Sequence, residues 1–210
     1  MNDSAANTGR VLWAGLRALL ALTVITGVLY PLAVTGVAQA AFPGKANGSE
    51  IKDASGRVVG SALIGQSYED LRWFQPRPSN GLGVNSVNTQ YELILSGATN
   101  RSGDNEDLVR WVTEAKAAVV RDNSVNGYTV KPSDVPADAI TSSGSGLDPH
   151  ISPEYAKIQV HRVAEKNHLT VAQVDRLVAD HTDDRVLGFI GEPRVNVLEL
   201  NVALKESAKG

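Results

Sequence analysis

The first pattern along the chain is a long uncharged run near its beginning. Residues 18–38, ALLALTVITGVLYPLAVTGVA, contain no charged side chain. As a helix with a rise of about 1.5 Å per residue, this run matches a bilayer hydrocarbon core of roughly 30 Å. Arg10 and Arg17 precede it, and the next charge is Lys45. The positive-inside rule therefore predicts one membrane helix over residues 18–41, with residues 1–17 cytoplasmic and residues 42–210 extracytoplasmic.

A cleavable signal peptide is the alternative interpretation of the same run. Residues 38–40, AQA, have the small-x-small form that signal peptidase recognises. The apolar part of a signal peptide is usually about 7–15 residues long, which is shorter than this run. The length therefore favours an uncleaved anchor in the lipid bilayer.

Within the predicted membrane helix, Gly27 and Pro31 are four residues apart. Proline lacks the N–H that would bond to the carbonyl four residues earlier, and its ring presses on that carbonyl. Thr23 and Gly27 form a small-xxx-small pair, which lets a second helix approach closely. Two interpretations stay open: a tolerated kink, or a helix-packing face formed by Thr23, Gly27 and Pro31.

The rest of the chain alternates between short extended and helical patterns. Glu50–Lys52 and Arg57–Gln66 flank a turn at 53–56 and predict a β-hairpin. The prolines, glycines and asparagines of WFQPRPSNGLGVNSVNT, from Trp73, predict a loop. Apolar residues at a helical period then predict a helix over residues 105–123.

Two capped helices are predicted in the C-terminal half. Ser152 is a suitable N-cap with Pro153 at the first helical position, and that helix is expected to reach about Lys166. Thr170 and Gln173 form a capping box for a second helix. The residues of this second helix expected to face inward are Val171, Val174, Leu177 and Val178.

The last pattern is an alternation over Val195–Leu200 after a turn rich in glycine and proline. It is typical of a strand, although it does not decide between strand and helix. Together these patterns predict a mixed α/β extracytoplasmic domain on a single N-terminal transmembrane helix.

Composition narrows the classes of function. The net charge of −3 gives no basic surface for nucleic acid, and the absence of cysteine excludes disulfides, cysteine metal sites and thiol catalysis. The paired helices around residues 162–181 resemble a helix-turn-helix. However, Asp175 and Asp180 would face phosphate together with Arg176, so a structural helical hairpin is the favoured interpretation.

The stretch TSSGSGLDPHISPEYAK, residues 141–157, contains the residue types of a hydrolase. A catalytic triad needs the base between nucleophile and carboxylate, and neighbours within one short loop rarely fold back that way. The stretch also lacks the lysine of a P-loop, although its backbone amides could hold an anion. The four histidines of the chain show no metal-ligand spacing. We therefore predict neither catalytic nor metal-binding residues.

Five stretches, in this order, resemble the C subunit of the Kdp potassium-transporting ATPase: RALLALTVITGVLYPLAVTGVAQ, GSALIGQ, WFQPRPS, SSGSGLDPHISPEYAKIQVHRVA and LGFIGEPRVNVLELNVAL. The resemblance runs from about Arg17 to Leu204. It implies an auxiliary, non-catalytic subunit in a bacterial plasma membrane, with a channel-like potassium-binding subunit and a P-type ATPase subunit as partners. The sequence agrees in lacking DKTGT, the motif that P-type pumps phosphorylate.

The resemblance also brings in ATP, because the family's C subunit is proposed to raise the ATP affinity of the pump subunit. ATP is cytoplasmic whereas the predicted domain is outside, so coupling across the membrane is the favoured interpretation and bound ATP is the alternative. An unrelated membrane-anchored binding domain and a secreted hydrolase are the other functions considered. The residues of the shared motif expected to act as structural or partner-contacting groups are Ser145, Gly146, Leu147, Asp148, His150 and Ser152.

One stretch departs from the family. Where the family usually has SGGSNLGPTN, this chain has LSGATNRSGDN, which matches only in Ser96, Gly97 and asparagines. If the segment at 96–105 contacts a partner, that contact is altered in this chain.

Overall fold

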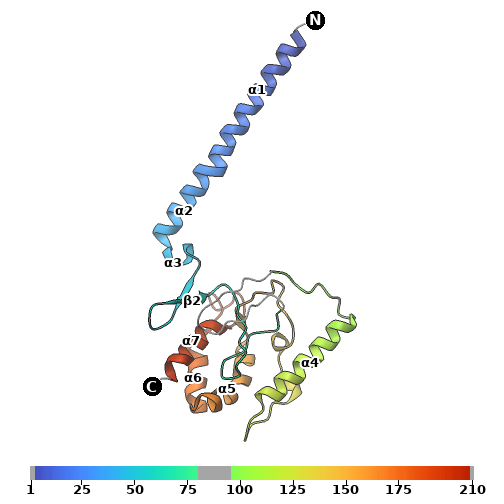
Figure 1. Ribbon diagram of the computed structural model, residues 1–210, viewed down its shortest axis with the longest axis vertical. Coiled ribbons are helices and arrows are strands. Elements are labelled where there is room, and N and C mark those ends of the chain that lie inside the picture. Colours follow the sequence, from blue (N-terminus) through green and yellow to red (C-terminus); the bar gives the residue numbers. More distant parts are fainter. Residues whose placement is uncertain (1–2, 80–95, 209–210) are drawn as a thin grey trace. The chain divides into compact units, whose positions relative to one another are not determined.

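The computed structural model describes residues 3–79 and 96–208, and the chain divides into two compact units, Met1–Ser49 and Glu50–Gly210. The first unit is helical (Figure 1). Its elements are α1 (Asp3–Val24), the π-helical turn η1 (Ile25–Leu29), α2 (Tyr30–Ala41) and the short α3 (Pro43–Ala46). Residues Ala6–Ala41 form one helical stretch that is long and apolar enough to cross a membrane. The prediction of one long apolar N-terminal helix is confirmed.

The π-helical turn lies where the sequence predicts a local disturbance. Pro31 has no N–H to offer the carbonyl of Gly27, and the preceding turn is widened so that the Tyr30 N–H donates to the Ile25 carbonyl. The Thr26 hydroxyl donates to the Leu22 carbonyl at 2.7 Å. The chain nevertheless stays helical through this region.

The second unit begins with an antiparallel hairpin of β1 (Glu50–Lys52) and β2 (Val58–Ser61). The carboxylate of Asp53 organises the turn by accepting hydrogen bonds from the amides of Ser55 and Arg57 at 2.9 and 3.1 Å. The predicted second strand, Arg57–Gln66, is too long. Ser61 ends it, because its hydroxyl accepts from the Leu63 amide and the chain turns there.

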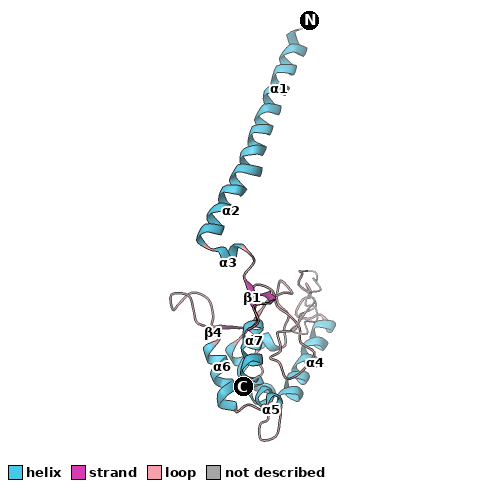
Figure 2. Ribbon diagram, turned by 60° about the vertical axis from the view of Figure 1, so that its left-hand side comes forward, coloured by secondary structure: helices cyan, strands magenta, loops and turns pink. Residues whose placement is uncertain are grey.

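Helices and one small sheet make up the rest of the second unit (Figure 2). Two short 3₁₀ turns, η2 and η3, follow the first of these helices, and the sheet has the antiparallel order β3-β5-β4. The elements are α4 (Glu106–Asn123), η2 (Pro132–Asp134), η3 (Ala137–Ala139), β3 (His150–Ile151), α5 (Pro153–Asn167), α6 (Val171–Asp180), β4 (Thr182–Asp183), β5 (Arg194–Asn196) and α7 (Val197–Ser207). The predicted mixed α/β class is confirmed.

The predicted caps are present. The Ser152 hydroxyl accepts from the Tyr155 amide at 3.0 Å, with Pro153 in the first turn of α5. Thr170 and Gln173 form the capping box of α6. Local signals in the sequence therefore set the starts of both helices.

The structure resolves one ambiguity in this region and shows one prediction to be wrong. The segment Val195–Leu200 is a strand only to Asn196, and α7 begins at Val197. The Asn196 side chain explains the change, because it accepts hydrogen bonds from the amides of Leu198 and Glu199 and so caps a helix. Val171, expected to face inward, is 36% exposed because it lies in the first turn of α6 at the edge of the packed face.

The core of the second unit surrounds α5, which packs against α4, α6 and β5. Phe74, from the predicted loop, is fully buried there. The other large contributors are Ile158, Val160, Val163, Val174, Val178, Val195, Leu200 and Leu204. This core is the scaffold on which the four family-like stretches of the second unit meet.

Candidate functional site

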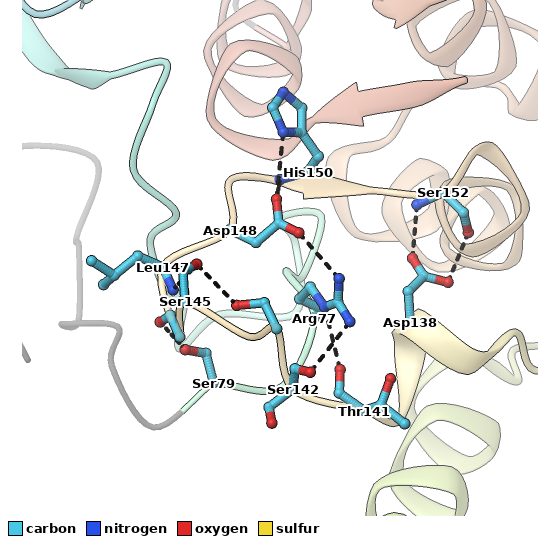
Figure 3. A network of polar contacts seen from close by, with 12 residues as sticks. Arg77, Ser79, Asp138, Thr141, Ser142, Ser145, Leu147, Asp148, His150 and Ser152 are labelled. Carbon is cyan, nitrogen blue, oxygen red and sulfur yellow. Dashed lines mark hydrogen bonds and ion pairs between the residues drawn. The ribbon is translucent and has the colours of Figure 1, made fainter. Parts of the chain in front are cut away.

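The motif loop, residues 141–152, connects η3 to α5 and is cross-linked by Arg77 (Figure 3). The guanidinium of Arg77 donates to the Thr141 and Ser142 carbonyls at 3.3 and 3.4 Å and pairs with the Asp148 carboxylate at 3.1 Å. One side chain from the WFQPRPS stretch thus ties the start of the loop to its middle. Because both side chains of the ion pair are partly buried, we expect it to be stronger than a fully exposed pair.

Asp148 is the charged centre of the motif loop. Its carboxylate accepts from the His150 amide at 3.0 Å and lies 3.4 Å from His150 Nδ1. Hydrogen bonding to the His150 side chain, together with the Arg77 guanidinium, lowers the pKa of Asp148 from 3.8 to about 2. The carboxylate is therefore ionised in the folded protein at neutral pH, as its partners require.

The middle of the motif loop is held from two sides. The Ser145 carbonyl accepts from the Gly97 amide at 2.8 Å and from the Ser96 hydroxyl at 2.9 Å. The Ser79 hydroxyl donates to the Gly146 carbonyl. Ser96 and Gly97 are residues at which the divergent segment still matches the family, and both contact the motif loop.

Two glycines are required by the close packing around the motif loop. Gly146 has a φ of +69°, and a Cβ there would lie 2.7 Å from the Gly97 carbonyl oxygen. Gly65, from the GSALIGQ stretch, donates its amide to the Leu147 carbonyl at 2.7 Å. A Cβ at Gly65 would lie 2.5 Å from the Asp148 carbonyl oxygen. Larger residues at either position would force the backbones apart.

The end of the motif loop is fixed by Asp138, which lies in η3. Its carboxylate accepts from the Ser152 amide at 2.7 Å and from the Ser152 hydroxyl at 2.9 Å (Figure 3). Ser152 therefore caps α5 and anchors the loop at the same time.

Buried amide side chains hold the neighbouring segment, residues 71–75. The Asn201 side chain accepts from the Phe74 amide at 2.9 Å and donates to the Phe74 carbonyl at 3.0 Å. Gln159 does the same for Gln75, at 2.7 and 3.0 Å. Each side-chain amide pairs with a backbone N–H and carbonyl as a neighbouring strand would, so the buried Phe74 and the half-buried Gln75 keep their backbone hydrogen bonds.

Arg162 completes this buried network and is only 1% exposed. Its guanidinium donates to Asn123 Oδ1 at 2.8 Å, to Gln159 Oε1 at 2.7 Å and to the Trp73 carbonyl at 2.9 Å. These acceptors are all uncharged oxygens, and burial lowers the pKa of Arg162 to about 10. The arginine joins α4, α5 and residues 71–75 into one body.

The chemistry available to the motif loop is limited. The Ser145 hydroxyl accepts from the Leu147 amide at 3.1 Å and lies 3.3 Å from the Ser143 hydroxyl, whereas the His150 ring contacts Asp148. The serine, aspartate and histidine thus do not form a relay. Over residues 3–79 and 96–208, no group of three or more histidine, aspartate or glutamate side chains could hold a metal ion.

An open groove borders the motif loop. Four carboxylates contribute to its lining, against the two guanidinium groups of Arg77 and Arg194. The four acidic residues are Asp138, Asp148, Glu154 and Glu192. This excess of carboxylates disfavours an anionic ligand such as a triphosphate.

The structure brings the predicted motif residues Ser145, Gly146, Leu147, Asp148, His150 and Ser152 into one network. Sequence reasoning missed Arg77 and Asp138, whose partners lie far along the chain or across a turn. It also missed Gln159, Arg162 and Asn201, although polar residues inside otherwise apolar segments are a signal of buried hydrogen bonding.

The residues of the proposed helix-packing face lie around the π-helical turn. A Cβ on Gly27 would have Thr23 Cγ2 as its nearest neighbour, at 3.9 Å, so these residues share one face. Pro31 follows at the start of α2. The packing of this face against another helix stays a prediction.

Comparison with known proteins gives a consistent result. The family model of the K+-transporting ATPase, c chain, matches residues 12–206. Potassium-transporting ATPase KdpC subunits of Streptomyces avermitilis and Streptomyces coelicolor are 72% and 68% identical, over 98% of this chain and 98% and 96% of theirs. The KdpC subunit of Mycobacterium tuberculosis is 46% identical over 93% of this chain and 97% of its own.

Proposed function

Because the chain belongs to the family of the K+-transporting ATPase c chain, we propose that it assembles and stabilises that pump's two large subunits. These are the channel-like potassium-binding subunit and the P-type ATPase subunit. The match over residues 12–206 carries the proposal. The chain is an accessory subunit rather than the catalytic one, and its sequence lacks the phosphorylation motif DKTGT.

The proposed arrangement in the membrane follows the charges. Residues 1–17 are cytoplasmic, residues 18–41 cross the bilayer, and residues 42–210 are extracytoplasmic. Arg10 and Arg17 before the apolar run, with Lys45 as the first charge after it, support this orientation. Since the chain has no cysteine, single cysteines at Asn7 and at the exposed Leu63 can be tested in intact cells with an impermeant thiol reagent, which should label position 63 but not position 7. Labelling of position 7 instead of position 63 would reverse the proposed topology.

The second unit supports a stabilising role through its rigidity. The four family-like stretches of the second unit are cross-linked by Arg77–Asp148, Gly65–Leu147 and the amide pairs at Phe74 and Gln75. A body held in this way can fix the separation of two partners, because bending it would break buried hydrogen bonds. The membrane helix adds a second contact through the face of Thr23, Gly27 and Pro31. Less of the pump should co-purify with a Gly27→Ile variant than with a Gly36→Ile variant, which is the matched control because Gly36 also lies within residues 18–41 and has open space around a Cβ.

Any effect on ATP affinity is proposed to travel through the complex. The acidic lining of the groove beside the motif loop favours this view over a nucleotide bound to the second unit. Cross-linking of a photoreactive ATP analogue in the intact complex distinguishes the two. A cross-link to residues beyond Ala41 would replace coupling by direct binding.

The decisive experiment is the potassium-dependent ATPase activity of the purified complex with and without this chain. We expect the two large subunits to separate during purification without it, and activity to fall. Adding back the chain should restore both assembly and activity. Full assembly and activity in its absence would refute the proposed function.

A further inference from the structure

Among residues 50–79 and 96–208, the segment between β4 and β5 presents the most exposed large apolar side chains. This apolar hairpin, residues 184–193, is closed by the pairing of Val186 with Ile190 and by an ion pair of Arg185 and Glu192 at 2.5 Å. Leu187 is 79% exposed and Phe189 is 73% exposed. Val186 and Ile190 are each at least half exposed. Four neighbouring large apolar side chains on one small projection form a patch of the kind that marks an interaction site.

The backbone conformation of Leu187 is unusual for a leucine. Its φ of 55° lies in the left-handed region, and Gly188 beside it has a φ of 81°. Tight hairpin turns with two positive φ values favour Asn-Gly, and leucine is strained in that conformation. A side chain that neither packs on its own chain nor suits its backbone is explained by something outside the described structure that contacts it.

The position of the hairpin indicates what that contact is. The Asn196 side chain, at the end of β5, donates to the Ala62 carbonyl just after β2 at 2.9 Å. This bond ties the end of β5 to the β1–β2 hairpin, with which the second unit begins, and Figure 2 shows β4, from which the apolar hairpin leads, near β1. The apolar membrane-length helix ends at Ala41, nine residues before Glu50. Nine residues of extended chain span at most about 30 Å, so this end of the second unit can reach the bilayer surface on whichever side it lies.

Charge points to insertion rather than electrostatic adsorption. At the base of the apolar hairpin, Asp183, Asp184 and Glu192 outnumber Arg185 and Arg194. Anionic headgroups would therefore not attract this base. Transfer of the leucine and phenylalanine side chains from water to the level of the acyl chains is, in contrast, favourable. We propose that the tip of the apolar hairpin, Val186 to Ile190, inserts into the lipid bilayer that holds the chain's own membrane helix. It forms a second, shallow attachment of the second unit.

The absence of cysteine makes a direct test practicable. A nitroxide is attached to Phe189→Cys in the full chain, reconstituted into phosphatidylcholine nanodiscs. Collisions with oxygen, which concentrates in lipid, are compared with those of a water-soluble nickel chelate. The matched control is Val109→Cys on α4, because Val109 is also an apolar side chain that is 53% exposed. We expect the ratio of oxygen to nickel collisions to be several-fold higher at position 189 than at position 109.

A second substitution separates lipid contact from folding. Leu187→Asn suits the left-handed backbone, so the apolar hairpin should stay closed while its tip becomes polar. In the chain labelled at position 189, this change should lower the collision ratio toward that of position 109. An unchanged ratio would show that the tip does not hold the label in lipid and would overturn the proposal.

The remaining outcomes are equally decisive. Equal ratios at positions 189 and 109, or a high ratio at position 189 only when phosphatidylglycerol is added, would overturn apolar insertion. Shielding of position 189 from both reagents in the assembled pump would assign the hairpin to a protein partner instead. The nanodisc measurement needs no partner subunit, so its failure leaves the proposed role in the potassium pump untouched.

Discussion

The motif loop and the apolar hairpin differ in whether their side chains find partners within the chain. The motif loop contains serines, an aspartate and a histidine, which suggest reactivity, yet Arg77, Asp138 and backbone groups bind them. The apolar hairpin contains no nucleophile, yet Leu187 and Phe189 stand in solvent. Reactive residue types are therefore a poor guide to the interaction surface of this protein, and unsatisfied groups are a better one.

The physical basis of the difference is the cost of leaving a group without its preferred surroundings. A polar group inside a packed region must be hydrogen-bonded, so a loop rich in polar side chains becomes rigid when it is well satisfied. An apolar side chain in water gains free energy only when something covers it. The first region should therefore control the stability of the fold, and the second should control contacts outside it.

The largest effect is expected at Gly146. Replacing it with valine places a β-branched side chain at φ +69° and a Cβ 2.7 Å from the Gly97 carbonyl oxygen. Strain and overpacking together should lower the free energy of unfolding by about 2–4 kcal/mol. Urea unfolding of the full chain in nonionic detergent, followed by tryptophan fluorescence, measures this change.

Gly144→Val is the matched control. Gly144 lies two residues away, has no positive φ and would have open space around a Cβ. Its substitution should change the free energy of unfolding little, and the pump should still assemble with it. Equal effects at the two glycines would mean that the packing against Gly97 does not matter.

The ion pair of Asp148 with Arg77 should contribute less. Asp148→Asn should lower the free energy of unfolding at pH 7 by about 1–2 kcal/mol, after allowance for partial exposure of the pair. The pKa of Asp148 is lowered from 3.8 unfolded to about 2 folded, so its ionised form stabilises the fold. The contribution is complete above pH values near the unfolded pKa and disappears as the pH falls through about 2.

Unfolding of the original chain and the Asp148→Asn variant should therefore be compared between pH 7 and pH 2, where the two curves should converge. Asp180→Asn is the control, because Asp180 pairs with Arg176 at 3.9 Å on the exposed face of α6. It should shift the curve little at any pH. A constant difference between the original chain and Asp148→Asn down to pH 2 would contradict the role of the carboxylate charge.

The same contrast explains which features can be predicted from the sequence. The starts of α5 and α6 are encoded within four residues by Ser152 with Pro153 and by Thr170 with Gln173, so local reasoning finds them. The start of α7 is missed because Asn196 caps a helix inside an apolar run that also fits a strand. Short apolar runs remain ambiguous when both faces are buried.

The motif loop could be located from the sequence but its partners could not. Arg77 and Asp148 are 71 residues apart, and Asn201 and Phe74 are 127 apart. No periodicity or cap connects residues over such distances, since the packing of the whole unit brings them together. The exposed tip is different again: leucine followed by glycine in a tight turn is visible in the sequence, but its exposure is not.

The apolar hairpin should respond in the opposite sense. Leu187→Asn should leave the free energy of unfolding unchanged or raise it by up to about 1 kcal/mol, because asparagine accepts the left-handed conformation more readily than leucine. The same urea experiment measures it. Leu63→Asn is the control, since Leu63 is similarly exposed, at 64%, without a positive φ. If Leu187→Asn destabilised the protein well beyond the control, the Leu187 side chain would contribute to the stability of the fold, contrary to this prediction.

The smallest effect is expected at Ser145, the residue that a search for a nucleophile would choose first. Its hydroxyl accepts one hydrogen bond from the Leu147 amide in an exposed position, while its carbonyl, which binds Gly97 and Ser96, is unaffected by side-chain substitution. Ser145→Ala should therefore cost less than about 1 kcal/mol and leave potassium uptake by cells nearly intact. If uptake were lost while the variant stayed folded and assembled, the hydroxyl would have a chemical role. The motif loop would then act on something outside the fold, and its contrast with the apolar hairpin would not hold.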